Sequence, residues 1–214
     1  MYFRILNDEA SGELTYLLAD LSQREAVLID PHARDLPVLA ALLSERELRL
    51  RWVLRTHHHD ALQISEPELL ARLGAPLVQG DTPDSLVGYD GRDGAVLPFG
   101  DELIHVVSTP GHTRTCLSFG WRDRFFCGGL LAVMSCPHQP RPQAPEALWD
   151  SVTRKIFTLP DETLLFTGHE RRARAVSTVL EQRRWHPLFA GLTRDEFLMH
   201  MASGSEQQIL TATF

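Results

Sequence analysis

Histidines follow several of the apolar runs in this chain, and histidine is a side chain that commonly binds metals. Three of them, His57, His58 and His59, come directly after the run LRLRWVLRT. Residues two apart on an extended backbone point to the same side, so His57 and His59 form a pair and His58 points away. Two more, His112 and His169, follow the runs VVSTPG and TLLFTG. Neutral imidazole suits both zinc and iron, so these positions indicate the chemistry of a metal centre.

The setting of these histidines decides between a metal site and an ordinary role. A lone histidine, such as His105 inside its own apolar run, is more often a surface or hydrogen-bonded residue than a ligand. However, Gly111 precedes His112 and Gly168 precedes His169, and glycine allows the backbone to approach a centre closely. An H-x-H pair and two Gly-His corners, all at the ends of predicted strands, together favour the metal site.

The elements that must position these residues can be read from hydrophobic period and turn residues. The expected strands are 14–20, 25–30, 50–56, 77–79, 102–108, 116–121, 124–127 and 163–167. The expected helices are 36–48, 67–73, 146–159, 173–185 and 194–201, with irregular loops at 80–101 and 135–145. Strands 14–20 and 25–30 read as a hairpin. The mixture predicts an α/β fold in which two sheets pack together with helices outside.

Length and composition set further bounds. A chain of 214 residues suits one domain, expected to span 1–214. The net charge of −7 argues against nucleic acid as the main partner. Three cysteines without a Cys-x-x-Cys pair fit a reducing compartment. No signal-peptide core and no run of 18 apolar residues stand in the sequence, so we expect a cytoplasmic protein without a membrane span.

Four short motifs carry a resemblance to a known family. They are THHHDAL at 56–62, TPGHT at 109–113, FCGGLL at 126–131 and FTGHE at 166–170. In this order they resemble the metallo-β-lactamase superfamily, and the branch they resemble most is that of the persulfide dioxygenases, followed by the hydroxyacylglutathione hydrolases (glyoxalase II). The similarity covers about residues 2–200. It implies an αββα sandwich, two mixed β-sheets flanked by helices.

The departures from the family pattern concern the ligands. The family reads H-x-H-x-D-H, but Ala61 and Leu62 stand at its last two positions, and Asp60 comes one residue early. Gly129 stands where the family has an aspartate that ligates metal. The resemblance therefore implies a degenerate site. It retains His57, His59 and His112, which match the three histidines of the family's first metal site.

Those three histidines imply one divalent metal, zinc or iron, because three imidazoles with an open fourth position form a catalytic zinc arrangement. The resemblance leaves His169 near that site as a proton shuttle or a substrate contact. Cys127, two residues before Gly129, is either an additional ligand or a buried structural cysteine.

The substrate-binding positions are also altered. In the loop after the glycine pair, Cys136 matches a family cysteine, and His138 stands where glutathione-using members carry an arginine. Leu188 replaces a second such arginine, and neither replacement can grip a carboxylate as guanidinium does. We expect a small-molecule substrate, with a thiol or persulfide as the candidate class, and a homodimer as the default assembly.

Three functions remain open on the sequence alone. The first is a mononuclear metalloenzyme that hydrolyses a small substrate, or oxidises a sulfur compound if iron binds. The second is a catalytically inactive family member that acts as a binding or regulatory protein. The third, nucleic-acid processing, rests on the arginines at 171–184, for which a solvated helix face is the simpler explanation.

Overall fold

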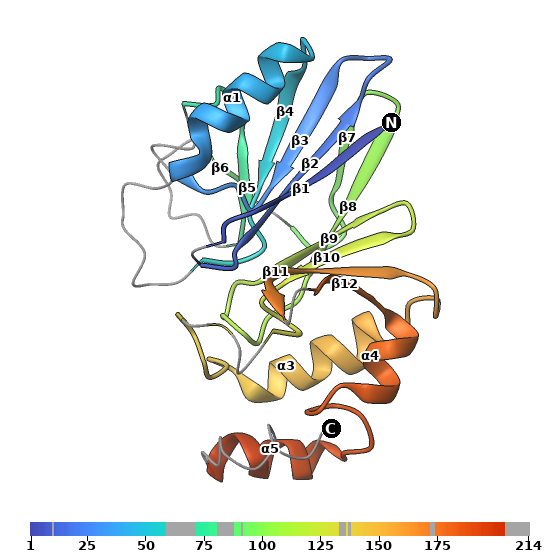
Figure 1. The fold of residues 1–214 in the computed structure, drawn as a ribbon. Helices are drawn as coiled ribbons and strands as arrows, with labels where there is room; N and C mark the ends of the chain where they lie inside the picture. Colours follow the sequence, from blue (N-terminus) through green and yellow to red (C-terminus); the bar gives the residue numbers. More distant parts are fainter. Residues whose placement is uncertain are drawn as a thin grey trace.

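Two six-stranded sheets pack face to face at the centre of the molecule (Figure 1). The computed structural model describes residues 1–9, 11–58, 72–80, 88–90, 92–132, 136, 138–171 and 174–203. The first sheet holds, in spatial order, β1 (Tyr2–Asn7), β2 (Leu14–Asp20), β3 (Glu25–Ile29), β4 (Arg49–Leu54), β5 (Leu77–Gln79) and β6 (Gly88–Asp90). The second holds β12 (Arg174–Thr178), β11 (Leu164–Arg171), β10 (Arg124–Gly128), β9 (Leu117–Trp121), β8 (Glu102–Ser108) and β7 (Val96–Phe99).

Helices cover both outer faces of this pair of sheets (Figure 1). The helical segments are η1 (Ala33–Asp35), α1 (Leu36–Glu45), α3 (Pro145–Ser151), the π-helical turn η2 (Val152–Ile156), α4 (Val179–Trp185) and α5 (Arg194–Ser203). Helix α1 buries Leu39, Leu42 and Leu43 against β2 and β3. Helices α3 and α5 pack over the second sheet, where Leu148 and Phe197 join one buried cluster. The predicted αββα sandwich is confirmed.

Apolar side chains from both sheets meet in the layer between them. Their alternation along each strand sends one set inward, as expected for strands with one face on a core. One aromatic group lies in this layer, with Phe3 stacked on Tyr16 and Phe126 stacked on Phe166. The Tyr16 hydroxyl donates a hydrogen bond to the Thr167 carbonyl, which ties β2 of one sheet to β11 of the other.

The expected elements are confirmed for the central strands, and two expectations are wrong, the start of a helix at 173 and a loop over 80–101. Residues 174–178 form β12 and not the start of a helix, because Val176 pairs with Phe166 and the Thr178 side chain caps α4 by accepting from the Glu181 N–H at 3.1 Å. Strand β7 lies inside the expected loop 80–101. Its Pro98 is tolerated because β7 is the edge of its sheet.

The remaining differences are two further strands and one helix that changes its type along its length. Strands β1 and β6 were not expected from the sequence, and β6 also falls within the predicted loop 80–101. The predicted helix 146–159 begins at Pro145 and changes to a π-helical turn at Val152, where the Phe157 N–H donates to the Val152 carbonyl at 2.8 Å. Most of the predicted helix 67–73 lies outside the described residues.

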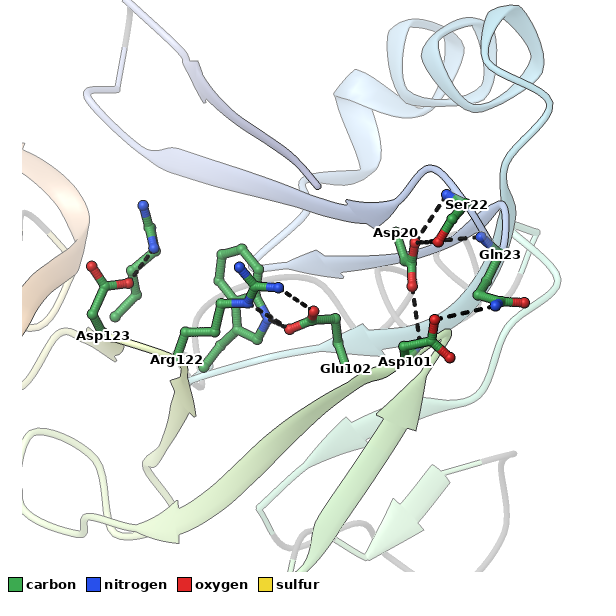
Figure 2. A network of polar contacts seen from close by, with 9 residues as sticks. Asp20, Ser22, Gln23, Asp101, Glu102, Arg122 and Asp123 are labelled. Atoms are coloured by element: carbon green, nitrogen blue, oxygen red, sulfur yellow. Dashed lines mark hydrogen bonds and ion pairs between the residues drawn. The ribbon is translucent and has the colours of Figure 1, made fainter.

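Polar contacts around Asp20 and Asp101 join the two sheets (Figure 2). The Asp20 carboxylate accepts from the Asp101 N–H at 2.9 Å and from the Ser22 N–H at 2.9 Å. Gln23 Nε2 in turn donates to the Asp101 carboxylate at 3.2 Å. The turn between β2 and β3 is thereby fixed to the turn between β7 and β8.

The described helices include none that is long and apolar enough to cross a membrane.

Candidate metal centre

His57 is held by a chain of hydrogen bonds that begins at Asp30, just after β3. Strands β3 and β4 are parallel, so the residues that follow them meet at one edge of the sheet. Asp30 accepts from the Thr56 N–H and from the Thr56 hydroxyl, each at 2.7 Å. Thr56 Oγ1 also lies 2.8 Å from His57 Nδ1. When Asp30 is ionised, the Thr56 hydroxyl donates to Asp30, so His57 Nδ1 is the donor in that contact and the ring lone pair is on Nε2.

The Asp30 carboxyl stands in an unusual local setting. Burial raises its pKa above the ordinary value, and the two hydrogen bonds from Thr56 oppose that rise. Its backbone is left-handed, with φ of 49°, which is uncommon for a non-glycine residue. The Asp30 N–H donates to the Leu54 carbonyl at 2.8 Å, and its carbonyl accepts from Thr15 Oγ1 at 2.8 Å. These bonds hold the strained residue in place.

His112 lies in a corner that Gly111 makes possible. Gly111 has φ of 146°, and a Cβ atom there would lie 2.5 Å from the backbone nitrogen of Leu148 in α3. The loop therefore packs directly on the helix, and the Gln143 N–H donates to the His112 carbonyl at 3.0 Å. The His112 side chain is fully buried. Burial, with a smaller contribution from His169, lowers the pKa of His112 to about 4, so this imidazole is neutral at pH 7.

His169 reaches the same place from the second sheet. It lies in β11, and it forms an isolated antiparallel bridge with Glu13 at the start of β2. The ring centroids of His57 and His112 are 4.9 Å apart, and those of His57 and His169 are 6.1 Å apart. Burial lowers the pKa of His169, and Glu13 opposes this shift. Both ring nitrogens of His169 are buried without a hydrogen-bond partner among the described residues.

Glu13 organises the polar groups beside His169. Its buried carboxylate accepts from Arg34 Nη2 at 2.6 Å and from Ser11 Oγ at 2.8 Å. His32 Nδ1 lies 3.7 Å from one carboxylate oxygen, and His138 Nε2 lies 3.8 Å from the other. Burial alone would raise the pKa of Glu13, but His32, Ser11 and Arg34 outweigh it and lower that pKa.

The other residues predicted for the site are Cys136, Cys127, Leu188 and His105, and the structure gives the surroundings of each. Cys136 is buried, and burial raises the pKa of its thiol. Cys127 donates its thiol hydrogen to the Phe166 carbonyl at 3.3 Å, and burial raises its pKa to about 12, which favours the structural role over that of a ligand. Leu188 packs in the apolar cluster under the helices, and His105 is exposed on β8.

The structure thus brings together His57 from the segment after β4, His112 from the loop after β8, and His169 from β11. His59, Ala61 and Leu62 lie outside the described residues. Within the described part of the chain, no three His, Cys, Asp or Glu side chains are placed to hold one ion jointly. The residues present nevertheless fit part of such a site, because His112 is neutral, Thr56 orients the His57 ring, and His169 has two buried nitrogens without a described partner.

Several residues of the site were not found from the sequence. Asp30 and His32 belong to the stretch IDPHA after β3, and Glu13 precedes β2. Asp30 and His32 could have been found from the expectation that β3 and β4 are parallel neighbours, because residues that follow adjacent parallel strands lie at the same edge of the sheet. Glu13 gave no such signal, since its pairing with His169 joins two different sheets.

Comparisons with known proteins agree with this geometry. The chain is 34% identical over 205 residues to the mitochondrial persulfide dioxygenase ETHE1 of Homo sapiens, covering 94% of this chain and 80% of that protein. It is 34% identical over 170 residues to a hydroxyacylglutathione hydrolase of Cereibacter sphaeroides, covering 76% of this chain and 64% of the relative. No family model matches the chain.

Solved structures give the same assignment. The crystal structure of ETHE1 from Myxococcus xanthus superposes with a TM-score of 0.84 at 35% identity, covering 94% of this chain and 90% of that one. TTHA1623, solved in a di-iron-bound form, superposes with a TM-score of 0.65 at 22% identity, covering 87% of this chain and 100% of that one, and shares the fold. The chain belongs to the metallo-β-lactamase superfamily, in the group that includes the persulfide dioxygenases and the hydroxyacylglutathione hydrolases.

Proposed function

We propose that this chain is a mononuclear metalloenzyme that acts on a small thiol-derived substrate, with persulfide oxidation as its main reaction. The observation that carries the proposal is the pair of imidazoles of His57 and His112, 4.9 Å apart, with the His57 ring oriented by Thr56 and Asp30. Similarity to persulfide dioxygenases over most of the chain supports it. The same similarity does not favour an inactive binding protein.

A single ion follows from the residue types at the altered positions. Ala61, Leu62 and Gly129 have no side chain that can ligate a metal. A second ion would need anionic ligands to attract and hold it, and two-metal sites depend on such carboxylates. His57, His59 and His112 are sufficient for one zinc or iron ion.

The chain's own residues would prepare and surround this ion. His57 and His112 would hold it through neutral imidazoles, and the Thr56–Asp30 pair would fix the His57 ring, as partners of ligating histidines commonly do. When bound, the metal supplies Lewis acidity to a substrate or water in its open position. His169, beside His57, would contact the substrate or exchange a proton with it.

The substrate class is inferred from the relatives and from the surroundings of His169. The named substrates of the relatives, persulfides and hydroxyacylglutathione, are small and contain sulfur. An ion held by neutral imidazoles alone keeps its positive charge, which favours an anionic ligand such as a thiolate or persulfide. His138, with Glu13 beside it, lies near enough to influence His169 and would line the entrance for such a molecule. Cys136 is the second candidate in this loop.

Elemental analysis of untagged protein tests the metal site. We expect nearly one zinc or iron per chain in the wild type and a clear loss in His112→Ala. His58→Ala is the matched control, because the two-residue period of an extended backbone predicts that His58 points away from the ligand pair, so this variant should retain the metal. A wild-type protein without metal, even after loading with zinc or ferrous iron, would refute the proposal.

Turnover assays then decide the reaction. Oxygen uptake with glutathione persulfide should depend on iron and should fall to background in His57→Ala. Uptake equal to that of the His57→Ala variant would exclude this reaction, and hydrolysis of a hydroxyacylglutathione by the zinc form would assign the chain to the other branch.

We also infer that 1–214 form one cytoplasmic domain and assemble as a homodimer. Light scattering and fractionation test these inferences.

A further inference from the structure

Gly129 is in direct contact with the imidazole of His112. A Cβ atom built on Gly129 would overlap Nδ1 and Cε1 of His112 and would lie 2.9 Å from its Cγ. Real Cβ atoms essentially never approach another heavy atom so closely. The His112 ring therefore occupies the volume in which any side chain at position 129 would begin.

The same relation recurs at two neighbouring glycines. A Cβ atom on Gly128 would lie 2.5 Å from the Cβ of Thr56 and 3.0 Å from His57 Nδ1. A Cβ atom on Gly168 would lie 3.1 Å from His57 Cε1. By contrast, a Cβ atom on Gly120 in β9 would meet its nearest neighbour at 3.5 Å, an ordinary contact. Gly80 and Gly100, outside this site, also lie against their neighbours. At Gly128, Gly129 and Gly168, however, the neighbour is a histidine of the site or the threonine that contacts it.

We propose that Gly129 is a positioning residue: its lack of a side chain fixes where the His112 imidazole lies. Gly128 and Gly168 make room for His57 in the same way. Position 129 is then occupied by a neighbour and is not an empty ligand position. The two features are linked, because the His112 ring can lie where it does only if position 129 has no side chain.

Two readings of Gly129 now make opposite predictions. If the position has only lost a ligand, a methyl group there is harmless, and an aspartate restores a carboxylate to the metal. If the position seats His112, the methyl group displaces the ring. Only the metal-affinity measurement depends on the proposed metalloenzyme function. The first tests therefore use metal-free protein.

The first experiment follows the histidine ring signals of the metal-free protein by NMR, with the His112 signal assigned from its loss in His112→Ala. We expect Gly129→Ala to shift the His112 ring signals, while Gly120→Ala leaves them in place. Unchanged His112 signals in Gly129→Ala would overturn the proposal, whatever the metal content of the wild type.

A double-mutant cycle covers the case in which Gly129→Ala folds poorly. In the His112→Ala background the ring is gone, so Gly129→Ala should lower the melting temperature far less than it does alone, because contacting residues are not additive. An equal loss of melting temperature in both backgrounds would contradict direct contact between the two positions.

Metal affinity gives the third readout, measured by calorimetric titration with zinc. Gly129→Ala should weaken binding by about 10- to 100-fold, the range found when groups that orient a ligand are altered. Gly120→Ala should bind as the wild type does. Affinity that is unchanged in Gly129→Ala and raised in Gly129→Asp would show a merely lost ligand and would overturn the proposal. Absence of both zinc and ferrous-iron binding in the wild type would refute the proposed function but leave the NMR result standing.

Discussion

Removal of the Thr56 hydroxyl should destabilise the protein through two partners at once. In Thr56→Val the side chain keeps its shape, but Asp30 loses a hydrogen bond of 2.7 Å and His57 Nδ1 loses its acceptor at 2.8 Å. Hydrogen bonds to charged groups contribute about 1.5–3 kcal/mol each, so we expect a loss of about that size in the free energy of unfolding. The Thr56 N–H still donates to Asp30, which keeps the loss from being larger.

Thr15 provides a matched control because it is equally buried and its hydroxyl bonds to the same residue. Thr15 Oγ1 donates to the Asp30 backbone carbonyl at 2.8 Å, a neutral acceptor. Thr15→Val should therefore cost only about 0.5–1.5 kcal/mol. The difference between the two valine variants isolates the charged hydrogen bond and the orientation of His57.

Urea unfolding followed by tryptophan fluorescence measures both variants. We expect lower midpoints with unchanged slopes, because the surface exposed on unfolding stays the same. Thr56→Ser, which keeps a hydroxyl, should recover most of the stability. If Thr56→Val and Thr15→Val lose the same free energy within about 0.5 kcal/mol, the charged character of the Asp30–Thr56 bond is refuted.

Three further outcomes are expected. Hydrogen bonds from the Asp101 N–H and from Ser22 lower the pKa of Asp20 from its ordinary 3.8 to about 2, so Asp20 adds stability above pH 3.8 that is lost as the pH falls toward 2. Acid unfolding should show this loss in the wild type and not in Asp20→Asn. Gly111→Ala should cost about 1–3 kcal/mol in urea unfolding, because φ is 146° and α3 blocks its Cβ. Tyr16→Phe should lower stability by about 0.5–1.5 kcal/mol in calorimetry, because it removes the hydrogen bond that joins the two sheets.

The sequence predicted the central strands well, because their apolar runs are long and end at clear turns. It failed where a local pattern had a second meaning. Residues 173–185 contain spaced apolar side chains that suit a helix, yet Val176 pairs across to Phe166 and places 174–178 in the sheet. Strand β7 was hidden in a loop rich in glycine and proline, and its pairing with β8 decides its conformation.

The candidate site divides in the same way. From the sequence alone came the H-x-H pair and the Gly-His corners, because residue type and the two-residue period of a strand need no tertiary information. The family resemblance added that Ala61, Leu62 and Gly129 stand at ligand positions and have no ligating side chain. Only the folded chain brought Glu13 beside His169 and placed the His112 ring over Gly129. These contacts join residues far apart in the sequence, and they depend on how two separate sheets pack. Gly129 looks like a lost ligand in the sequence, but in the structure the His112 ring fills the space where its side chain would begin.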